Sequence, residues 1–210
     1  MQRYAYAFLA FLAIGIAGYS IVVYGFLPLG SIVHPDMRVN FEAHATTVYV
    51  HIFASSIALL CGVLQFSTSL RTRRPLLHRY TGRVYFLLGV IPGGIAGLIM
   101  AINAYGGIVS KLGFGLLALL WFYTGWQAYT AIRAGQIQQH QQWMIRNYAL
   151  TCAAITLRIY LPLSMVAGIP FELAYPAIAW LCWVPNLAYA QFKAGKLRRS
   201  SKGIATQKVF

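Results

Sequence analysis

The sequence predicts an all-α polytopic membrane protein with six transmembrane helices, in which spans two to five form a four-helix core. Three observations lead to this prediction. Hydrophobic residues make up 59% of the 210 residues and charged residues only 10%, whereas soluble domains carry about 25% charged residues. Apolar stretches near the roughly 20 residues needed to cross a bilayer occur six times. Basic residues gather in alternate loops between these stretches.

The six predicted spans cover residues 5–29, 43–66, 83–104, 112–132, 147–167 and 173–192, within a single transmembrane domain of residues 1–192. The first follows a lone Arg3 and is longer than the apolar core of a signal peptide, so we interpret it as a retained span. The remaining residues, 193–210, form a basic and polar tail, for which we expect disorder or contact with lipid.

The distribution of charge predicts the orientation. Basic residues at the inner loops and the tail are Arg71, Arg73, Arg74, Arg79, Arg83, Arg133, Arg146, Lys193, Lys196, Arg198, Arg199, Lys202 and Lys208. The opposite loops hold only Arg38 and Lys111, together with the three acidic residues Asp36, Glu42 and Glu172. The positive-inside rule therefore places both termini in the cytoplasm.

The net charge of +14 has a bearing on partners. In a soluble protein such an excess indicates nucleic-acid binding. Here the basic residues flank apolar spans, which favours membrane orientation and anionic lipid instead. We therefore expect the lipid bilayer, and no nucleic acid, as a partner. The sequence gives no indication of the oligomeric state.

Two features of the spans bear on packing. Gly89, Gly93 and Gly97 are spaced by four residues, which lets a neighbouring helix backbone approach closely. Pro92 is expected to kink the same helix. Aromatic residues near the span ends are typical of the belts at membrane interfaces; they are Tyr80, Tyr85, Trp143 and Tyr148.

Two inner loops resemble each other, and both carry a histidine. RTRRPLLHRYTGRVY contains His78 and IRAGQIQQHQQWMIRNY contains His140, each followed by an arginine five or six residues later. Spans three and five start on the same side of an antiparallel bundle and can lie diagonally opposite. Two imidazoles that face each other across a bundle can hold a haem. The alternative is that both histidines contact lipid phosphate or cap a neighbouring helix.

A second polar site is predicted in the outer half of the membrane. Arg158 lies about 18 Å along the helix from Arg146, close to the depth of His51. No acidic residue is encoded within a span to pair with Arg158. Its partner could be a backbone carbonyl, an outer-loop carboxylate that folds back, or the anion of a bound ligand. The alternatives are an arginine that reaches the interface and a histidine hydrogen-bonded between helices.

The segments LHRYTGRVYF (77–86) and HQQWMIRNYALTCAAITLRIYLP (140–162) resemble the signature segments of a bacterial membrane-protein family, domain-of-unknown-function family 2306. VHIFASSIALLCGVLQF (50–66) looks like the preceding helix of that family. The resemblance covers roughly residues 45–165 and implies a multi-span protein of the bacterial inner membrane. Its motif positions are His51, Gln65, His78, Arg79, Gly82, Arg83, His140, Trp143, Arg146 and Arg158.

A looser resemblance is to the ascorbate-type transmembrane cytochrome b family, which implies six helices with haems held by histidine pairs in a four-helix core. Span four has no histidine, so the sequence supports at most one haem of this kind. The resemblance thus adds to the hypothesis that His78 and His140 coordinate the iron of one haem b.

Two functions remain open at this stage. The first is an electron-transfer protein with haem b between His78 and His140, beside Arg83, Arg146 and Trp143, and a quinone or a second group near His51 and Arg158. The second is a non-redox binding, transport or assembly protein. Its pocket for an anionic or amphipathic ligand would be lined by His51, Gln65, Asn103, Gln127 and Arg158. Whether the protein is an enzyme stays open, although no hydrolase, P-loop or dinucleotide motif is present.

Overall fold

The computed structural model describes the backbone of residues 3–207 and the side chains up to Leu197. The elements are α1 (Arg3–Phe26), α2 (Pro35–Ala43), α3 (Ala45–Gln65), α4 (Thr68–Arg73), α5 (Pro75–Val84), the π-helical η1 (Tyr85–Val90), α6 (Ile91–Ile102), α7 (Gly107–Arg133), α8 (Ile137–Thr151), α9 (Ala153–Val166), α10 (Phe171–Leu181) and α11 (Val184–Gln207). No β-strand occurs among these residues. The predicted all-α polytopic fold is therefore confirmed.

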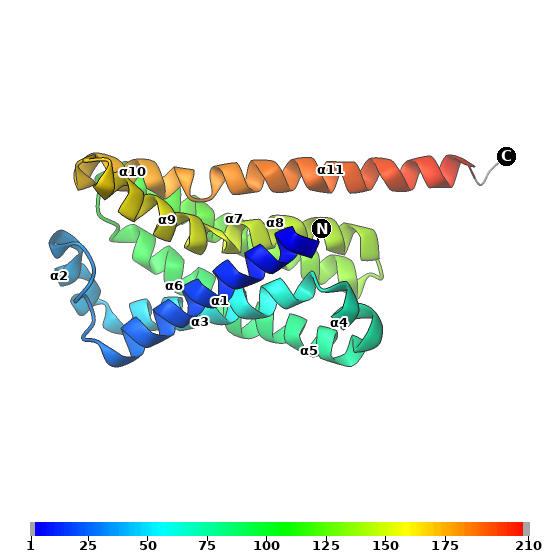
Figure 1. Ribbon diagram of the computed structural model, residues 1–210, viewed down its shortest axis with the longest axis horizontal. Coiled ribbons are helices and arrows are strands. Elements are labelled where there is room, and N and C mark those ends of the chain that lie inside the picture. The colour runs from blue at the N-terminus through cyan, green and yellow to red at the C-terminus, as the bar shows by residue number, and fades with distance from the viewer. Residues whose placement is uncertain (1–2, 208–210) are drawn as a thin grey trace.

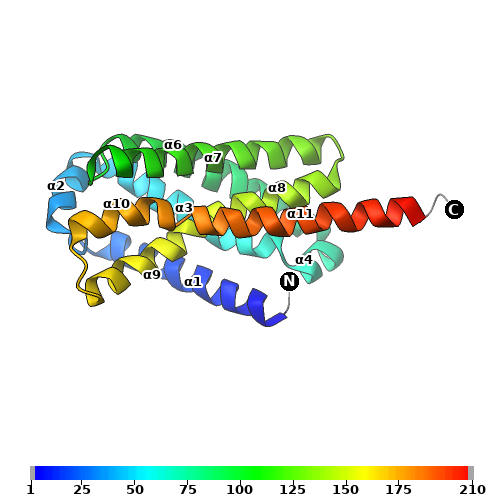
Figure 2. The ribbon, with the colours of Figure 1, turned by 90° about the horizontal axis from the view of Figure 1, so that it is seen from above.

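Five helical segments of the described chain are long and apolar enough to cross a membrane: Arg3–Phe26, Ala45–Gln65, Pro75–Ile102, Gly107–Arg133 and Ile137–Val166. The predicted sixth span, 173–192, is divided between α10 and α11, which are separated at Cys182 and Trp183. In both ribbon views these two helices run nearly in line along the bundle (Figures 1 and 2). A sixth crossing would thus be made by two helices together, and it stays a prediction.

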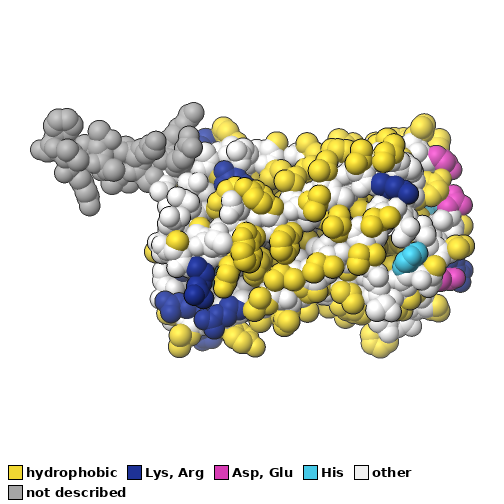
Figure 3. Space-filling model, turned by 180° about the vertical axis from the view of Figure 1, so that it is seen from behind, with side chains coloured by type: hydrophobic (Ala, Val, Ile, Leu, Met, Phe, Trp, Pro, Cys, Tyr) yellow, Lys and Arg dark blue, Asp and Glu magenta, His cyan; other side chains and the backbone are white. Residues whose placement is uncertain are grey.

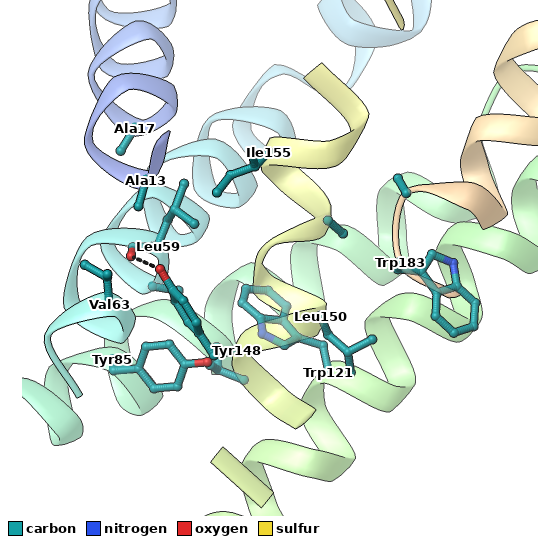
Figure 4. Close-up of a cluster of buried hydrophobic side chains, with 14 of the residues drawn as sticks. Ala13, Ala17, Leu59, Val63, Tyr85, Trp121, Tyr148, Leu150, Ile155 and Trp183 are labelled. Carbon is teal, nitrogen blue, oxygen red and sulfur yellow. Dashed lines mark hydrogen bonds between the residues drawn. The ribbon is translucent and has the colours of Figure 1, made fainter. Parts of the chain in front are cut away.

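The expected four-helix core is present. The chain segments α3, α5–η1–α6, α7 and α8–α9 pack in sequence around a common interior, and α8 closes the ring against α3. Outside this core, α1 packs against α3 and α9, while α10 and α11 cover α7 and α8 (Figures 1 and 2). The buried apolar cluster at the centre includes Leu59, Tyr85, Trp121 and Tyr148 (Figure 4).

The two ends of the bundle differ in charge. The start of α1, the α4–α5 segment, the α7–α8 turn and the far end of α11 lie at one end (Figure 1). The short helix α2 and the α6–α7 and α9–α10 loops lie at the other. On the face drawn in Figure 3, most Lys and Arg side chains gather at the first end and the Asp and Glu side chains at the second, with apolar side chains between them. This arrangement agrees with the charge distribution that predicted the orientation.

Two helices begin earlier than the hydropathy of the sequence predicts. The third segment starts at Pro75 instead of residue 83, and the fifth at Ile137 instead of residue 147. His78 and His140 therefore lie within the first turns of their helices. The prediction of interfacial belt positions was wrong for Tyr85 and Tyr148, which are only 1% and 3% exposed. Both residues lie about two to three turns inside the helices, so they belong to the core.

Buried hydrogen bonds join the four core segments at one level. The Asn147 amide donates to the Trp121 carbonyl at 2.6 Å and to Thr124 Oγ1 at 2.9 Å, both on α7. The Tyr85 hydroxyl of η1 donates to Asn147 Oδ1. The next residue, Tyr148, donates its hydroxyl proton to the Leu59 carbonyl of α3 at 3.1 Å (Figure 4). Satisfied polar groups of this kind fix one arrangement of helices where water is excluded.

The predicted glycine contacts are present on the third segment. A Cβ atom added to Gly89 would lie 2.9 Å from the Ala58 Cα atom, so the backbones of η1 and α3 touch there. A Cβ atom added to Gly97 would lie 3.0 Å from Nδ1 and Cε1 of His51. The glycine row therefore serves two purposes, since it brings α3 and the third segment together and leaves room for the His51 ring.

We expect Gly89→Ala to destabilise the protein by about 1–3 kcal/mol, because the added methyl group meets the Ala58 backbone in a closely packed contact. Gly18→Ala is the matched control, since an added Cβ atom there meets nothing within 4 Å. Thermal unfolding of the purified protein in detergent measures the difference. Equal melting temperatures for the two variants would contradict the close approach of η1 to α3.

The charge asymmetry predicts that the α4–α5 end faces the cytoplasm. Alkaline phosphatase fused after Tyr105, in the α6–α7 loop, is expected to be active, and green fluorescent protein fused there to be dark. The opposite pattern is expected for fusions within the α7–α8 turn at Gly135. If the reporters behave in the reverse way at both sites, the orientation is inverted.

Candidate functional site

A cavity of about 550 Å³ lies between α1, α3, α6, α7, α9 and α10 in the half of the bundle next to α2. Most of its wall is apolar, with Ile16, Leu59, Phe114, Leu117, Leu157 and Leu161 among the lining residues. Pockets of this size and character hold small organic molecules and are lined mostly by apolar side chains with a few polar groups. The polar groups of this cavity therefore decide what it can bind.

His51 is held on the cavity wall by a specific contact. Its Nδ1 atom lies 2.8 Å from the Gly93 carbonyl oxygen of α6. A carbonyl only accepts hydrogen bonds, so Nδ1 carries the proton and donates it. The Nε2 atom of the neutral ring is then left as a hydrogen-bond acceptor. Gly97 lies against the Nδ1–Cε1 edge of the ring, which leaves the imidazole little freedom to turn.

Arg158 lines the same cavity as His51. Its guanidinium donates one hydrogen bond, from Nη1 to the Ala154 carbonyl one turn earlier, at 3.0 Å. The side chain thus folds back toward the middle of the bundle, as side chains on helices commonly do. In the described part of the chain no carboxylate lies within 4 Å of it, since the ion pairs found there are His34–Asp36 and Arg38–Glu42. A guanidinium has five N–H donors, so most of its capacity is unused.

Further polar residues of the cavity were missed by the sequence analysis. Tyr19 and Tyr24 of α1 line it and lie near enough to Arg158 to interact with its charge. Ser55, four residues after His51 on the same helix face, has a buried hydroxyl with no hydrogen-bond partner. The spacing of Ser55 from His51 was the signal that could have revealed it. The sequence contained no comparable signal for the two tyrosines, because tyrosine is common in membrane helices.

Residues of α2 and of the loops before α2 and after α6 border the mouth of the cavity. Asn40 of α2 donates to the Asn103 carbonyl at 2.6 Å, and the His34 ring stacks on Phe171 with centroids 3.9 Å apart. Desolvation, together with the nearby carboxylates of Asp36 and Glu172, raises the pKa of the Tyr105 hydroxyl. The rim is therefore aromatic and acidic, whereas the positive charge of the cavity lies deeper.

The expected polar cluster is only partly assembled. His51, Asn103 and Arg158 line the cavity, with Asn103 at the mouth. Gln65 lies at the opposite end of α3, where it donates to Thr81 Oγ1 at 2.8 Å. Gln127 does not line the cavity, and it donates to the Tyr123 hydroxyl on the same helix, α7, at 3.0 Å. Gln65 thus links α3 to α5 beside Gly82, where an added Cβ atom would lie 3.0 Å from Gln65 Oε1.

His78 and His140 lie at the basic end, away from this cavity. The Nδ1 atom of His140 is 2.8 Å from the Ala128 carbonyl, so it donates there and leaves Nε2 with a free lone pair. The Nδ1 atom of His78 is buried without a hydrogen-bond partner. His140 lies near enough to His78 for the two rings to interact electrostatically. Both rings therefore keep a nitrogen that could bind a metal, and the haem site stays a prediction.

The other residues predicted for this site have separate contacts. Arg146 lies over the Trp143 ring, 4.7 Å from its centroid, and donates to Gln191 Oε1 of α11 at 2.6 Å. The Trp143 ring also meets Tyr123 of α7 edge-on, at 5.7 Å between centroids. Through these contacts Trp143 and Arg146 join α8 to α7 and α11. Arg83 is exposed at the end of α5.

Comparison with known families identifies the core of the chain. Residues 48–194 match the family model described as predicted membrane protein (DUF2306). The chain belongs to this family. The DUF2306 segment runs from α3 into α11 and thus contains both histidines of the basic end as well as His51 and Arg158. Helices α1 and α2, which complete the wall and mouth of the cavity, lie outside it.

No curated protein matches the chain, and no solved structure does. The looser resemblance to the ascorbate-type cytochrome b family finds no support in these comparisons. The DUF2306 assignment confirms the predicted family and extends its match beyond residue 165 to residue 194. It describes a membrane protein and names no activity.

Proposed function

We propose that the protein binds an amphipathic ligand inside the membrane, in the cavity between α1, α3 and α9, and acts as a non-redox binding, transport or assembly protein. The observation that supports this most is Arg158. Its charge lies on a cavity wall, where one carbonyl of its own helix accepts its hydrogen bond. A charge within a membrane protein is costly unless it is paired. A ligand that supplies the missing partner would be held strongly there.

The rest of the cavity fits a ligand with a polar head and an apolar tail. The polar groups His51, Ser55 and Arg158 are surrounded by apolar side chains of α1, α7 and α9. Apolar walls of this kind can accept an apolar tail, while the few polar groups can hold a head. The head and the tail would therefore find complementary surfaces in one cavity.

The lining favours binding over acid–base chemistry. It contains no acidic residue, and of its three histidines His34 and His44 lie at the mouth. The Nδ1 proton of His51 is engaged with the Gly93 carbonyl. These residues are therefore better suited to positioning a ligand beside Arg158 than to transferring a proton to that ligand.

Dansyl undecanoic acid, a fluorescent amphiphile, tests the proposal on the purified protein in non-ionic detergent. We expect Arg158→Ala to weaken its binding by about thirtyfold or more, because losing one partner of a buried charge pair costs about 2–5 kcal/mol. Arg79→Ala is the matched control, since Arg79 is exposed on α5 at the other end of the bundle. If the probe binds both variants equally well, the cavity is not its site.

A second candidate function is electron transfer through haem b bound between His78 and His140. The free Nε2 of His140 supports it, because histidines that bind metals commonly donate their other nitrogen to a carbonyl. Bound haem would supply one-electron chemistry.

Absorbance spectroscopy tests this second candidate. Protein expressed with added haem is expected to show a Soret band that His140→Ala removes or shifts, because the iron loses an axial ligand. His44→Ala, at the other end of the bundle, serves as the control and is expected to leave the band unchanged. Haem-free protein from haem-supplemented cells would exclude the candidate.

A further inference from the structure

We infer that the cavity selects a single-chain amphiphile whose head carries one negative charge, with a long-chain carboxylate as the best match. This inference rests on the proposed function and specifies its ligand. Three properties of the cavity lead to it: the count of charges on its wall, the protonation of His51, and its volume.

The charge count sets the charge of the head. Arg158 is the only lysine, arginine, aspartate or glutamate among the lining residues, so the wall carries a fixed charge of +1. At low dielectric an uncompensated charge is costly. A neutral head would leave the guanidinium unpaired, and a phosphate monoester, which carries nearly two charges at neutral pH, would leave an excess negative charge. A head with a single negative charge brings the total to zero.

His51 adds no charge to the cavity wall when its ring is neutral, so the total charge of the wall stays at +1. Because Nδ1 donates to the Gly93 carbonyl, the neutral ring presents Nε2 as an acceptor. An acceptor repels an anionic oxygen, so the head is directed to the guanidinium. A carboxylate matches this group well, since its two oxygens can accept parallel hydrogen bonds from one guanidinium. The hydroxyls of Tyr24 and Ser55, which also line the cavity, can donate to the same head.

The volume sets the number of tails. At about 550 Å³ the cavity lies in the range that encloses one small organic molecule. A single acyl chain can lie along the apolar walls of α1 and α9, beside Ile16, Leu157 and Leu161. A phosphodiester lipid also carries one negative charge, but its two tails double the apolar volume. The single-chain carboxylate is therefore favoured over the phospholipid.

Competition against bound dansyl undecanoic acid tests the head group. Hexadecanoate, hexadecanol and hexadecyl phosphate share one tail and carry one, no and nearly two negative charges at mildly alkaline pH; phosphatidylglycerol adds a singly charged head with two tails. We expect hexadecanoate to compete about tenfold or more better than each of the others, which is about 1.4 kcal/mol in binding free energy. Arg158→Gln should abolish its advantage over hexadecanol while hexadecanol binds as before.

The outcomes separate the inference from the function on which it rests. Equal competition by hexadecanol, or stronger competition by hexadecyl phosphate or phosphatidylglycerol, overturns the inference and leaves an amphiphile-binding cavity. Failure of every compound, with dansyl undecanoic acid itself unbound, overturns the proposed function. If Arg158→Gln does not fold, Tyr24→Phe gives the second measurement. It should reduce the preference for hexadecanoate over hexadecanol, and an unchanged preference removes the tyrosine from head-group recognition and counts against the inference.

Discussion

Two consecutive residues of α8, Asn147 and Tyr148, hold the bundle together, because their side chains reach all three other core segments. Asn147 binds η1 and α7, and Tyr148 binds the backbone of α3. Lipid offers no hydrophobic force between helices, so such bonds and close packing must fix their arrangement. Trp121 and Thr151, which are joined by a hydrogen bond of 2.9 Å, extend this network to the wall of the cavity. The bonds that stabilise the core therefore also form the floor of the candidate binding site.

The same network gives a structural meaning to the two similar inner loops. Tyr85 follows His78 by seven residues, and Asn147 follows His140 by seven. Seven residues are about two helical turns, so each loop places a histidine at the basic end and a hydrogen-bonding residue about 10 Å deeper on a similar face. The two deeper residues bond to each other. The basic end and the cavity are thus separate sites that share one internal support.

Hydropathy was sufficient to predict the five apolar segments found in the described chain and the four of them that form the core, because these depend on composition over long windows. The rise of 1.5 Å per residue predicted similar depths for Arg158 and His51, which line one cavity in the structure. The starts of α5 and α8 escaped prediction, since the basic residues of α5 and the glutamines of α8 lower the hydropathy there. In the structure α5 packs against α3, and α8 packs against α7. Tyr24 and Ser55 escaped prediction because their role depends on the cavity they line. Gln65 and Gln127 show the converse, for these polar residues lie outside the cavity: Gln65 links α3 to α5, and Gln127 bonds within α7.

The π-helical turn at Tyr85–Val90 determines how the two parts of the third segment, α5 and α6, are rotated relative to each other. A π turn closes its hydrogen bonds over five residues instead of four, so it holds one residue more than an α turn. If the same residues were α-helical instead, the extra residue would rotate everything that follows by about 100°. Tyr85 would still face Asn147, while Gly93 and Gly97 would turn away from His51. The π turn therefore sets how the core-facing side chains of the third segment are oriented relative to those that face the cavity.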